Sequence, residues 1–337
     1  MTDPRPVLEV RDLAASFFTR RGEVRAVRGV SFALRAGETL ALVGESGSGK
    51  TATAMSILRM LPGKAQITGG EIVFDGKDLL KLSNKEMASI RGRHIGLIPQ
   101  DPAASLNPLM TTGQHMTELL GVHLGMKGTT ARARSIELFR SVGIPEPERR
   151  FDQYPHQLSG GMRQRVMIAL AIACHPALLL ADEPTTALDP TIQAQILDLI
   201  VKLGREMDTA TILITHNLGI VAGVCDRVAV MYGGRIVEIA PRDPLFAEPR
   251  HPYTLGLLRC VPRVDRLSVG EFQSIPGQPP DLLQVLPGCS FAERCDYATE
   301  ACLTQNPALT PGEGVHRAAC LHQDQVEQDQ VERAVVA

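Results

Sequence analysis

A glycine-rich segment with a single lysine carries the clearest chemical signal in the sequence. It fits the pattern G-x-x-x-x-G-K-S/T at every fixed position, and its residues are Gly44, Glu45, Ser46, Gly47, Ser48, Gly49, Lys50 and Thr51. Glycines at this spacing let successive backbone N–H groups turn toward one anion. Lys50 can then reach phosphate oxygens, and the hydroxyl of Thr51 can bind Mg²⁺. This segment, the phosphate loop, therefore predicts a nucleotide site; a helix cap without a ligand would not require the full match.

Two adjacent carboxylates end an apolar stretch later in the chain. Residues 177–181 read as a buried strand, and Asp182 and Glu183 follow it directly. Asp182 is suited to hold Mg²⁺ through water, and Glu183 is suited to polarise a water molecule that attacks phosphate. A solvated acidic turn is the main alternative when this stretch is taken alone. The phosphate loop in the same chain favours the catalytic interpretation.

A serine and two glycines stand before a second apolar stretch. They are Ser159, Gly160 and Gly161, in the segment L-S-G-G-M-R-Q. Because the N-terminus of a helix attracts anions, these residues are placed to receive a phosphate group.

The elements that position these residues follow from the hydrophobic pattern. Strands are expected at residues 7–10, 30–34, 38–43, 177–181, 211–215, 227–231 and 235–240, and helices at 50–60, 116–124, 132–142 and 190–206. The phosphate loop follows an expected strand and precedes an expected helix, which is the order of elements in a phosphate-binding unit. The last two strands, joined across two glycines, form an expected hairpin.

This pattern predicts an α/β fold with a mostly parallel core, an antiparallel β region and an inserted helical subdomain. A nucleotide-binding domain is expected over residues 1–245, with its helical subdomain at about 101–170. A small, irregular, proline-rich C-terminal domain is expected over 246–325, followed by a tail over 326–337.

The motifs occur in the order found in ABC ATPases, and the chain resembles that family. The resemblance implies the ABC cassette of the P-loop NTPases, with ATP and Mg²⁺ as ligands. It also implies that Ser159, Gly160 and Gly161 contact the γ-phosphate of ATP held by the opposite subunit. Met162 stands where the family most often has glutamine.

Four further residues take roles from the same resemblance. Gln100 is expected to sense Mg²⁺ and the attacking water, and His216 to contact the γ-phosphate. Asp189 is expected to communicate across the dimer. Phe17 is expected to stack on the adenine, with Phe18 as the alternative.

Two segments narrow the resemblance to one branch of the family. Residues 100–108 and the H-P-Y-T segment at 251–254 resemble the ATPases of oligopeptide and dipeptide importers, in particular the subunit often called D. The resemblance implies a second, different ATPase chain, two transmembrane permease subunits and an extracytoplasmic solute-binding protein. It places the chain as a peripheral subunit on the cytoplasmic face of the inner (plasma) membrane. Peptides are the expected solute, with nickel, glutathione or sugar left open.

The segment after Gln100 is the expected contact with the permease. In the family, this part of the helical subdomain receives the short coupling helix, and Leu106, Asn107, Pro108 and Met110 are expected to form the contact. A plain connecting loop is the alternative.

Charge and motif content argue against other functions. Basic residues number 35 and acidic residues 37, so the net charge of −2 gives no general attraction to nucleic acid, and no nucleic-acid partner is expected. Long heptad arms, a second cassette and the guanine-reading N-K-x-D motif are absent from the sequence. No apolar run reaches the ~18 residues that span a bilayer, so a membrane role must come through partner chains.

Cysteines gather near the C-terminus. Cys289, Cys295, Cys302 and Cys320 lie in a loop-rich segment, and the chain shows no export signal, so metal ligation is favoured over disulfides. The spacing lacks the C-x₂-C knuckles of zinc ribbons, which favours a 4Fe–4S cluster over Zn²⁺. The pattern also resembles a cysteine motif of peptide-importer ATPases. Two disulfides, or free buried thiols, remain alternatives.

Overall fold

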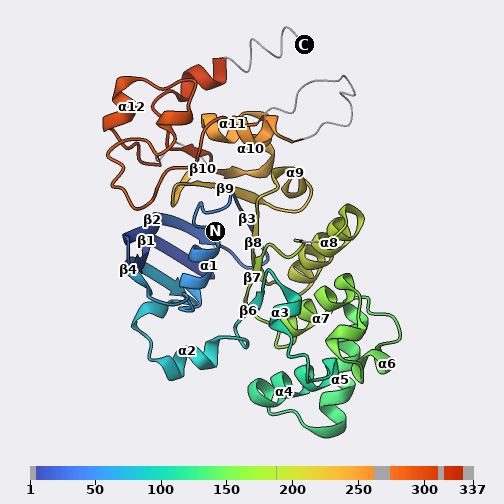
Figure 1. Ribbon diagram of the computed structural model, residues 1–337. Coiled ribbons are helices and arrows are strands. Elements are labelled where there is room, and N and C mark those ends of the chain that lie inside the picture. The colour runs from blue at the N-terminus through green and yellow to red at the C-terminus, as the bar shows by residue number, and fades with distance from the viewer. Residues whose placement is uncertain (1–4, 187, 262–273, 310–314, 329–337) are drawn as a thin grey trace. The chain divides into compact units, whose positions relative to one another are not determined.

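The computed structural model describes residues 5–186, 188–261, 274–309 and 315–328 (Figure 1). The chain divides into two compact units. The first unit comprises Met1–Leu8, Ala33–Thr39 and Val73–Ile214, and the second comprises Glu9–Phe32, Leu40–Ile72 and Thr215–Ala337.

Three parallel strands form the sheet of the first unit. They are β6 (Ile95–Ile98), β7 (Leu178–Asp182) and β8 (Ala210–Thr215), with β7 between the other two. Ile98 pairs with Ala181, so β6 and β7 end at the same edge of the sheet. Every residue of β7 and β8 is buried, as expected for strands covered on both faces.

The helical subdomain at about 101–170 stays a prediction. The described residues of the first unit form several helices. They are α2 (Asn84–Ile90), α3 (Pro102–Ser105), α4 (Thr112–Leu124), α5 (Gly128–Ser141), α6 (Pro147–Phe151), α7 (Gly160–Ile172) and α8 (Pro190–Glu206). Helices α4, α5, α6 and α7 pack against one another, and α7 also packs against β6. That last contact requires Gly96, because a Cβ there would lie 2.3 Å from the carbonyl oxygen of Ala171.

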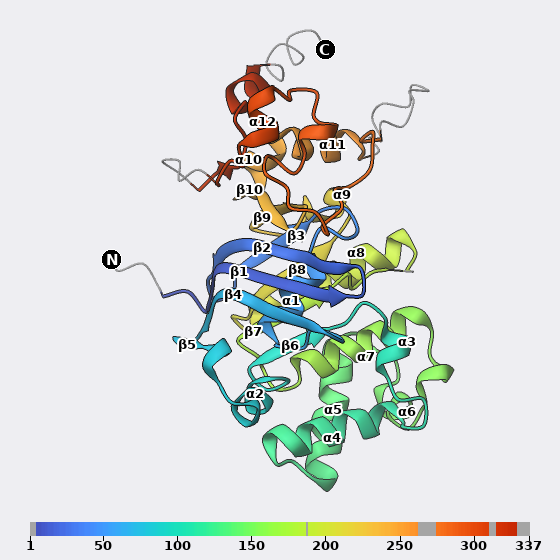
Figure 2. The same cartoon turned by 60° about the vertical axis from the view of Figure 1, so that its left-hand side comes forward.

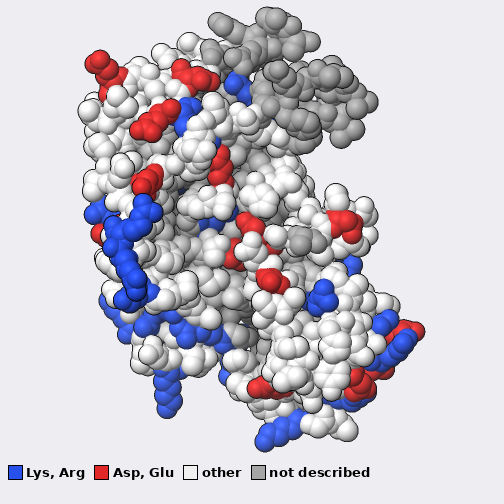
Figure 3. Space-filling model, viewed as in Figure 1, with Lys and Arg blue, Asp and Glu red and all other residues white. Residues whose placement is uncertain are grey.

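Helix ends in the first unit follow local capping signals. Thr111 and Gln114 form a capping box, so α4 begins four residues before the predicted start at Met116. Asp189 caps α8 by accepting a hydrogen bond from the N–H of Ile192 at 3.0 Å. On the face shown in Figure 3, basic and acidic side chains lie together over α6. These surface ion pairs are exposed and therefore add little stability.

Two groups of strands belong to the second unit. The first has the order β2-β1-β4, with β1 (Leu8–Thr19), β2 (Gly22–Leu34) and β4 (Ala65–Phe74), which lie side by side in Figure 2. The short β5 (Lys77–Asp78) belongs to the first unit, where it pairs with the last two residues of β4, Val73 and Phe74. Sequence alternation located only short parts of β1 and β2, because both strands continue through charged and polar positions.

The second group has the order β11-β10-β9-β3. Its strands are β3 (Thr39–Val43), β9 (Arg227–Tyr232), β10 (Arg235–Pro241) and β11 (Arg317–Ala318). Strand β9 pairs with β3 in parallel and with β10 in the predicted antiparallel hairpin. The helices of this unit are α1 (Lys50–Ile57), α9 (Leu218–Val221), α10 (Arg242–Ala247), α11 (Pro252–Arg259) and α12 (Glu300–Thr304).

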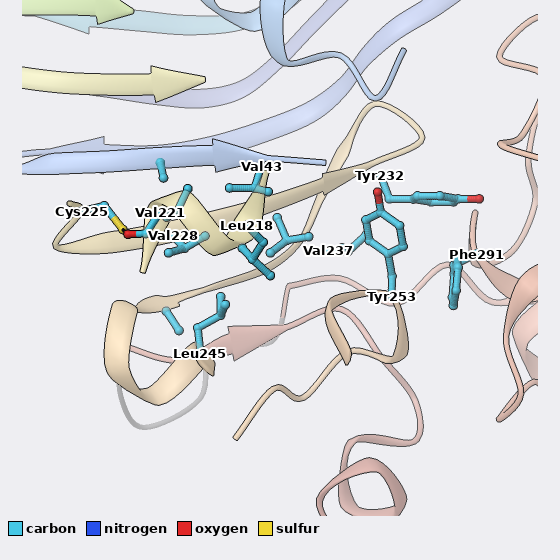
Figure 4. Close-up of a cluster of buried hydrophobic side chains, with 13 residues drawn as sticks. Val43, Leu218, Val221, Cys225, Val228, Tyr232, Val237, Leu245, Tyr253 and Phe291 are labelled. Carbon is cyan, nitrogen blue, oxygen red and sulfur yellow. Dashed lines mark hydrogen bonds between the residues drawn. The ribbon is translucent and has the colours of Figure 1, made fainter. Parts of the chain in front are cut away.

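The C-terminal segment shares a hydrophobic core with the strand that leads into the phosphate loop. Tyr253 of α11 and Phe291 pack with Tyr232 of β9 in a cluster that also contains Val43 (Figure 4). The ring centroid of Tyr232 lies 4.5 Å from the ring centroid of Tyr253 and 5.2 Å from that of Phe291. A segment with few aliphatic residues thus gains its order by burying aromatic rings against β9. The boundary at residue 245 stays a prediction.

In the parts of the chain that the structure describes, no helix has both the length and the apolar character needed to cross a bilayer.

Candidate nucleotide-binding site

The phosphate loop joins β3 to α1 in the second unit. Helix α1 begins at Lys50, and the residue before it, Gly49, has a φ angle of 103°. L-residues with side chains rarely adopt this conformation. A Cβ on Gly49 would also lie 2.3 Å from the carbonyl oxygen of Ala26 in β2. Glycine is therefore required here both by the turn and by the close approach of the backbone.

The lysine of the phosphate loop is buried inside the curve of the loop. Lys50 is 5% exposed, and its ammonium donates hydrogen bonds to the carbonyl oxygens of Gly44 at 2.7 Å and Glu45 at 2.8 Å. It also contacts the hydroxyl of Ser48 at 3.3 Å. These oxygens orient the positive charge of the lysine, a group that can bind phosphate oxygens.

The acidic pair lies at the end of β7 in the first unit. Asp182 is the last residue of the strand and is 3% exposed. Glu183 has a φ angle of 45°, and its N–H donates to the carbonyl oxygen of Ile214 at 3.0 Å. Positive φ in a non-glycine residue costs free energy and occurs in turns as well as at functional sites.

Gln100 and Glu183 meet in the structure. The side-chain amide of Gln100 donates to Oε2 of Glu183 at 2.9 Å, and the hydroxyl of Thr186 donates to the same oxygen at 3.0 Å. The contact arises because β6 and β7 are adjacent and parallel, so the residues that follow them share one edge of the sheet. The two donors orient a carboxylate that is only partly buried.

The serine and glycines predicted to bind phosphate lie at the N-terminus of α7. Ser159 caps the helix by accepting a hydrogen bond from the N–H of Met162 at 3.3 Å. Ser159 and Gly160 are exposed. The helix N-terminus is thus accessible, and its partial positive charge favours an anionic ligand.

The remaining predicted residues are mostly exposed. His216 lies one residue beyond β8, and Asp189 lies at the start of α8. Both are exposed, and Asp189 already serves as a helix cap. On β1, Phe17 is partly buried and Phe18 is 41% exposed. The exposed fraction alone does not separate these two candidates for the adenine contact.

The four C-terminal cysteines line one pocket, together with His251, Phe291 and His322 among others. Burial raises the pKa of Cys295 to about 12 and that of Cys320 to about 11, so both thiols are protonated at neutral pH. All seven cysteines are free thiols, so the disulfide alternative is not present. Among the described residues, however, no group of three or more His, Cys, Asp or Glu side chains is placed to hold a metal ion. The predicted metal centre is therefore not supported by this geometry.

The segment predicted to contact the permease comprises residues 106–110 and is called the docking loop below. The exposure of its leucines differs from the prediction. Leu106 is 2% exposed, so its inclusion in the contact surface was wrong, while Leu109 is 84% exposed. The reason is a tight turn, in which the N–H of Asn107 donates to His115 at 2.9 Å and the N–H of Leu109 donates to Asn107 at 3.0 Å. The turn directs Leu106 inward and Leu109 outward.

Three residues that contact the predicted site were missed by the sequence reasoning. Thr186 follows Glu183 at the spacing of a single turn, which is a weak signal. Tyr253 and Arg294 both contact Glu45 of the phosphate loop. Tyr253 belongs to the H-P-Y-T segment and Arg294 precedes Cys295, but nothing in the local pattern links either residue to position 45.

Two protein-family models match the chain. The model described as "ABC transporter" matches residues 27–186, and the model described as "Oligopeptide/dipeptide transporter, C-terminal region" matches residues 237–302.

Curated relatives match over nearly the full length. The oligopeptide transport ATP-binding protein OppD of Bacillus subtilis is 52% identical over 94% of this chain and 90% of its own. The dipeptide transport ATP-binding protein DppD of the same species is 52% identical over 95% of each chain. OppD of Salmonella typhimurium is 48% identical over 92% of this chain and 93% of its own.

Solved structures that resemble this chain include an ATP-binding cassette and a part of an ABC transporter complex. A dimeric, post-hydrolysis state of the cassette MJ0796 bound to ADP and Pi has a TM-score of 0.63 and 27% identity, covering 70% of this chain and 98% of that one. The structure of cbiO1 from Clostridium perfringens has a TM-score of 0.62 and 29% identity, covering 72% of this chain and 91% of that one.

Proposed function

The chain belongs to the ATP-binding subunits of the ABC transporter family, and we propose that it hydrolyses ATP to drive the import of oligopeptides or dipeptides. The observation that carries the proposal is the extent of the similarity. Identity near 50% with the peptide-transport ATP-binding proteins OppD and DppD spans more than 90% of the chain. In addition, residues 237–302 match the model of the C-terminal region of oligopeptide and dipeptide transporters.

The phosphate loop is proposed to bind the β- and γ-phosphates of ATP. Lys50, now held by carbonyl oxygens of the loop, would exchange part of these contacts for phosphate oxygens. The hydroxyl of Thr51, the carboxylate of Asp182 and the amide of Gln100 are the oxygen donors proposed for Mg²⁺. The chemistry of these donors fits the ion, which neutralises charge on the phosphates when it is bound. Phe17 is proposed to stack on the adenine.

Glu183 is proposed to polarise the attacking water. Hydrogen bonds from Gln100 and Thr186 hold its carboxylate in one orientation, and a general base must be oriented toward the proton that it accepts. His216 is proposed to contact the γ-phosphate, as the resemblance to the family implies.

A second ATPase chain is proposed to complete each site. Ser159, Gly160 and Gly161 would bind the γ-phosphate of ATP held by that chain, and Asp189 would transmit the contact. The exposed N-terminus of α7 supports this role, because the partial positive charge of a helix N-terminus favours an anion. We propose that the second chain differs in sequence from this one.

The chain is proposed to associate with the membrane by binding to permease subunits. The chain would sit as a peripheral subunit on the cytoplasmic face of the inner membrane, beneath two permeases served by an external solute-binding protein. The exposed Leu109 in the docking loop supports such a contact.

Uptake measurements with several solutes test the proposed function. Cells in which the chain carries Lys50→Ala are expected to lose uptake of labelled peptides, because the substitution removes the charge from the phosphate loop. Uptake of nickel and of glutathione is expected to stay at the parent level. Loss of either of those activities, with peptide uptake intact, would assign a different solute to the importer.

We also propose a 4Fe–4S cluster at Cys289, Cys295, Cys302 and Cys320, with Zn²⁺ as the alternative. What supports the proposal is that four thiols line one pocket, although they are not placed at ligand positions in this structure. Thiolates are the ligands that such clusters prefer.

Metal analysis of protein purified without oxygen tests this site. The parent is expected to be brown, to absorb near ~400 nm and to contain about four irons per chain. Cys295→Ser should lose the iron, whereas Cys260→Ser, an exposed cysteine that does not line this pocket, should keep it. Colourless protein that contains one zinc per chain would show that the site binds Zn²⁺ and not a cluster. A folded parent without metal would contradict the proposal of a metal site.

A further inference from the structure

Arg294 is a buried arginine whose five N–H groups are all used. Its side chain is 4% exposed and forms a bidentate ion pair with Glu45, with Nη1 at 2.8 Å from Oε2 and Nη2 at 3.0 Å from Oε1. The other hydrogen bonds go to the carbonyl oxygens of Pro276 at 2.8 Å and Ile275 at 3.1 Å, and to the hydroxyl of Tyr232 at 3.1 Å. A guanidinium with this many fixed partners has a single orientation.

Glu45 is held at three points. Its carboxylate pairs with Arg294, and its backbone N–H donates to the hydroxyl of Tyr253 at 2.9 Å. Its carbonyl oxygen accepts from the ammonium of Lys50 at 2.8 Å. One residue of the phosphate loop therefore links the lysine of the site to two side chains of the C-terminal segment. Figure 4 shows Tyr253 beside Tyr232 and Phe291, whose packing fixes the position of its ring.

The ion pair also matters for the charge of the loop. Glu45 is an acidic residue within a loop expected to receive phosphate, and an uncompensated carboxylate there would repel the ligand. The guanidinium of Arg294 neutralises it. Because the bridge is largely removed from water, solvent screens it much less than a surface ion pair.

We propose that Arg294 is a positioning residue for the phosphate loop. By holding Glu45, it keeps the carbonyl groups that orient Lys50 in place and removes a repulsive charge from the phosphate site. The affinity for ATP then depends on the C-terminal segment, which contributes no residue to the nucleotide motifs. This inference rests on the proposed ATPase function.

A double-mutant cycle on the full chain tests the proposal. Arg294→Gln is expected to raise the dissociation constant of ATP about tenfold, as expected for loss of a charge-assisted bidentate contact. Glu45→Gln in the Arg294→Gln background should recover part of the loss, because it removes the uncompensated carboxylate. In the assembled complex, KM for ATP should rise while kcat at saturating ATP stays near the parent value.

Hydrogen exchange supplies a readout that does not require nucleotide. A peptide covering residues 44–50 should exchange faster in Arg294→Gln, because Glu45 loses its anchor. Arg242→Gln is the matched control, since it removes the ion pair of a partly exposed arginine with the exposed Asp243, in the same unit. It should change neither exchange nor ATP affinity.

The outcomes separate the inference from the proposed function. Unchanged exchange and unchanged ATP affinity in Arg294→Gln would overturn the inference, as would fully additive effects of the two substitutions. If Arg294→Gln does not fold, Glu45→Gln alone tests the contact from the loop side: faster exchange supports it and parent-like exchange overturns it. A parent chain that does not bind ATP would overturn the proposed function, while the exchange result would still decide the contact.

Discussion

Glu183→Gln is expected to bind ATP as the parent does and to hydrolyse it about 10²–10⁴-fold more slowly, the usual contribution of a general base. The amide has nearly the same shape as the carboxylate but cannot accept a proton from water. The phosphate loop lies elsewhere in the sequence and keeps its own contacts through Lys50, so binding should persist.

Single-turnover hydrolysis in the assembled complex, alongside ATP binding, measures this effect. Glu206→Gln is the matched control, because Glu206 lies in α8 of the same unit and forms an exposed pair with Lys202 at 3.8 Å. It should hydrolyse ATP at the parent rate. Parent-like hydrolysis in Glu183→Gln would assign the base to another residue.

Leu109→Glu is expected to abolish peptide uptake while leaving ATP binding intact. Leu109 is 84% exposed, so the substitution removes almost no packing within the chain. It places a charge on the docking loop, where an apolar contact with the permease is proposed. A charge buried without a partner at such a contact is costly, so the complex should weaken or uncouple.

Uptake, ATP hydrolysis and co-purification with the permeases measure this second effect. Val122→Glu provides the control: Val122 is 73% exposed, lies on α4 of the same unit and is outside the docking loop. It should transport peptides normally. Equal loss in both variants, or normal uptake in Leu109→Glu, would remove the docking loop from the proposed contact.

Most of the fold could be predicted from local sequence patterns. The bounds of α8, residues 190–206, agree with prediction, because Asp189 and Pro190 mark its start and its apolar face is continuous. Strand β7 and the hairpin of β9 and β10 agree within a residue or so. The position of the phosphate loop could also be predicted from the sequence, since the backbone conformation of such a loop requires glycines at fixed positions.

The local sequence does not predict which side chains of a loop are buried and which are exposed. Leu106 and Leu109 belong to the same short segment, and no periodic pattern distinguishes them. Their opposite exposure follows from the hydrogen bonds among Asn107, His115 and Leu109, which only the folded turn makes.

The sequence by itself determined which residues could do chemistry, because the motifs combine residue type with a spacing of a few positions. The tertiary structure alone decided which of them meet. Gln100 and Glu183 are 83 positions apart and come together only because β6 and β7 are neighbours. Arg294 and Glu45 are 249 positions apart, and their pairing depends on the C-terminal aromatic rings packing against β9. Contacts at such separations depend on the whole path of the chain, which no local pattern records.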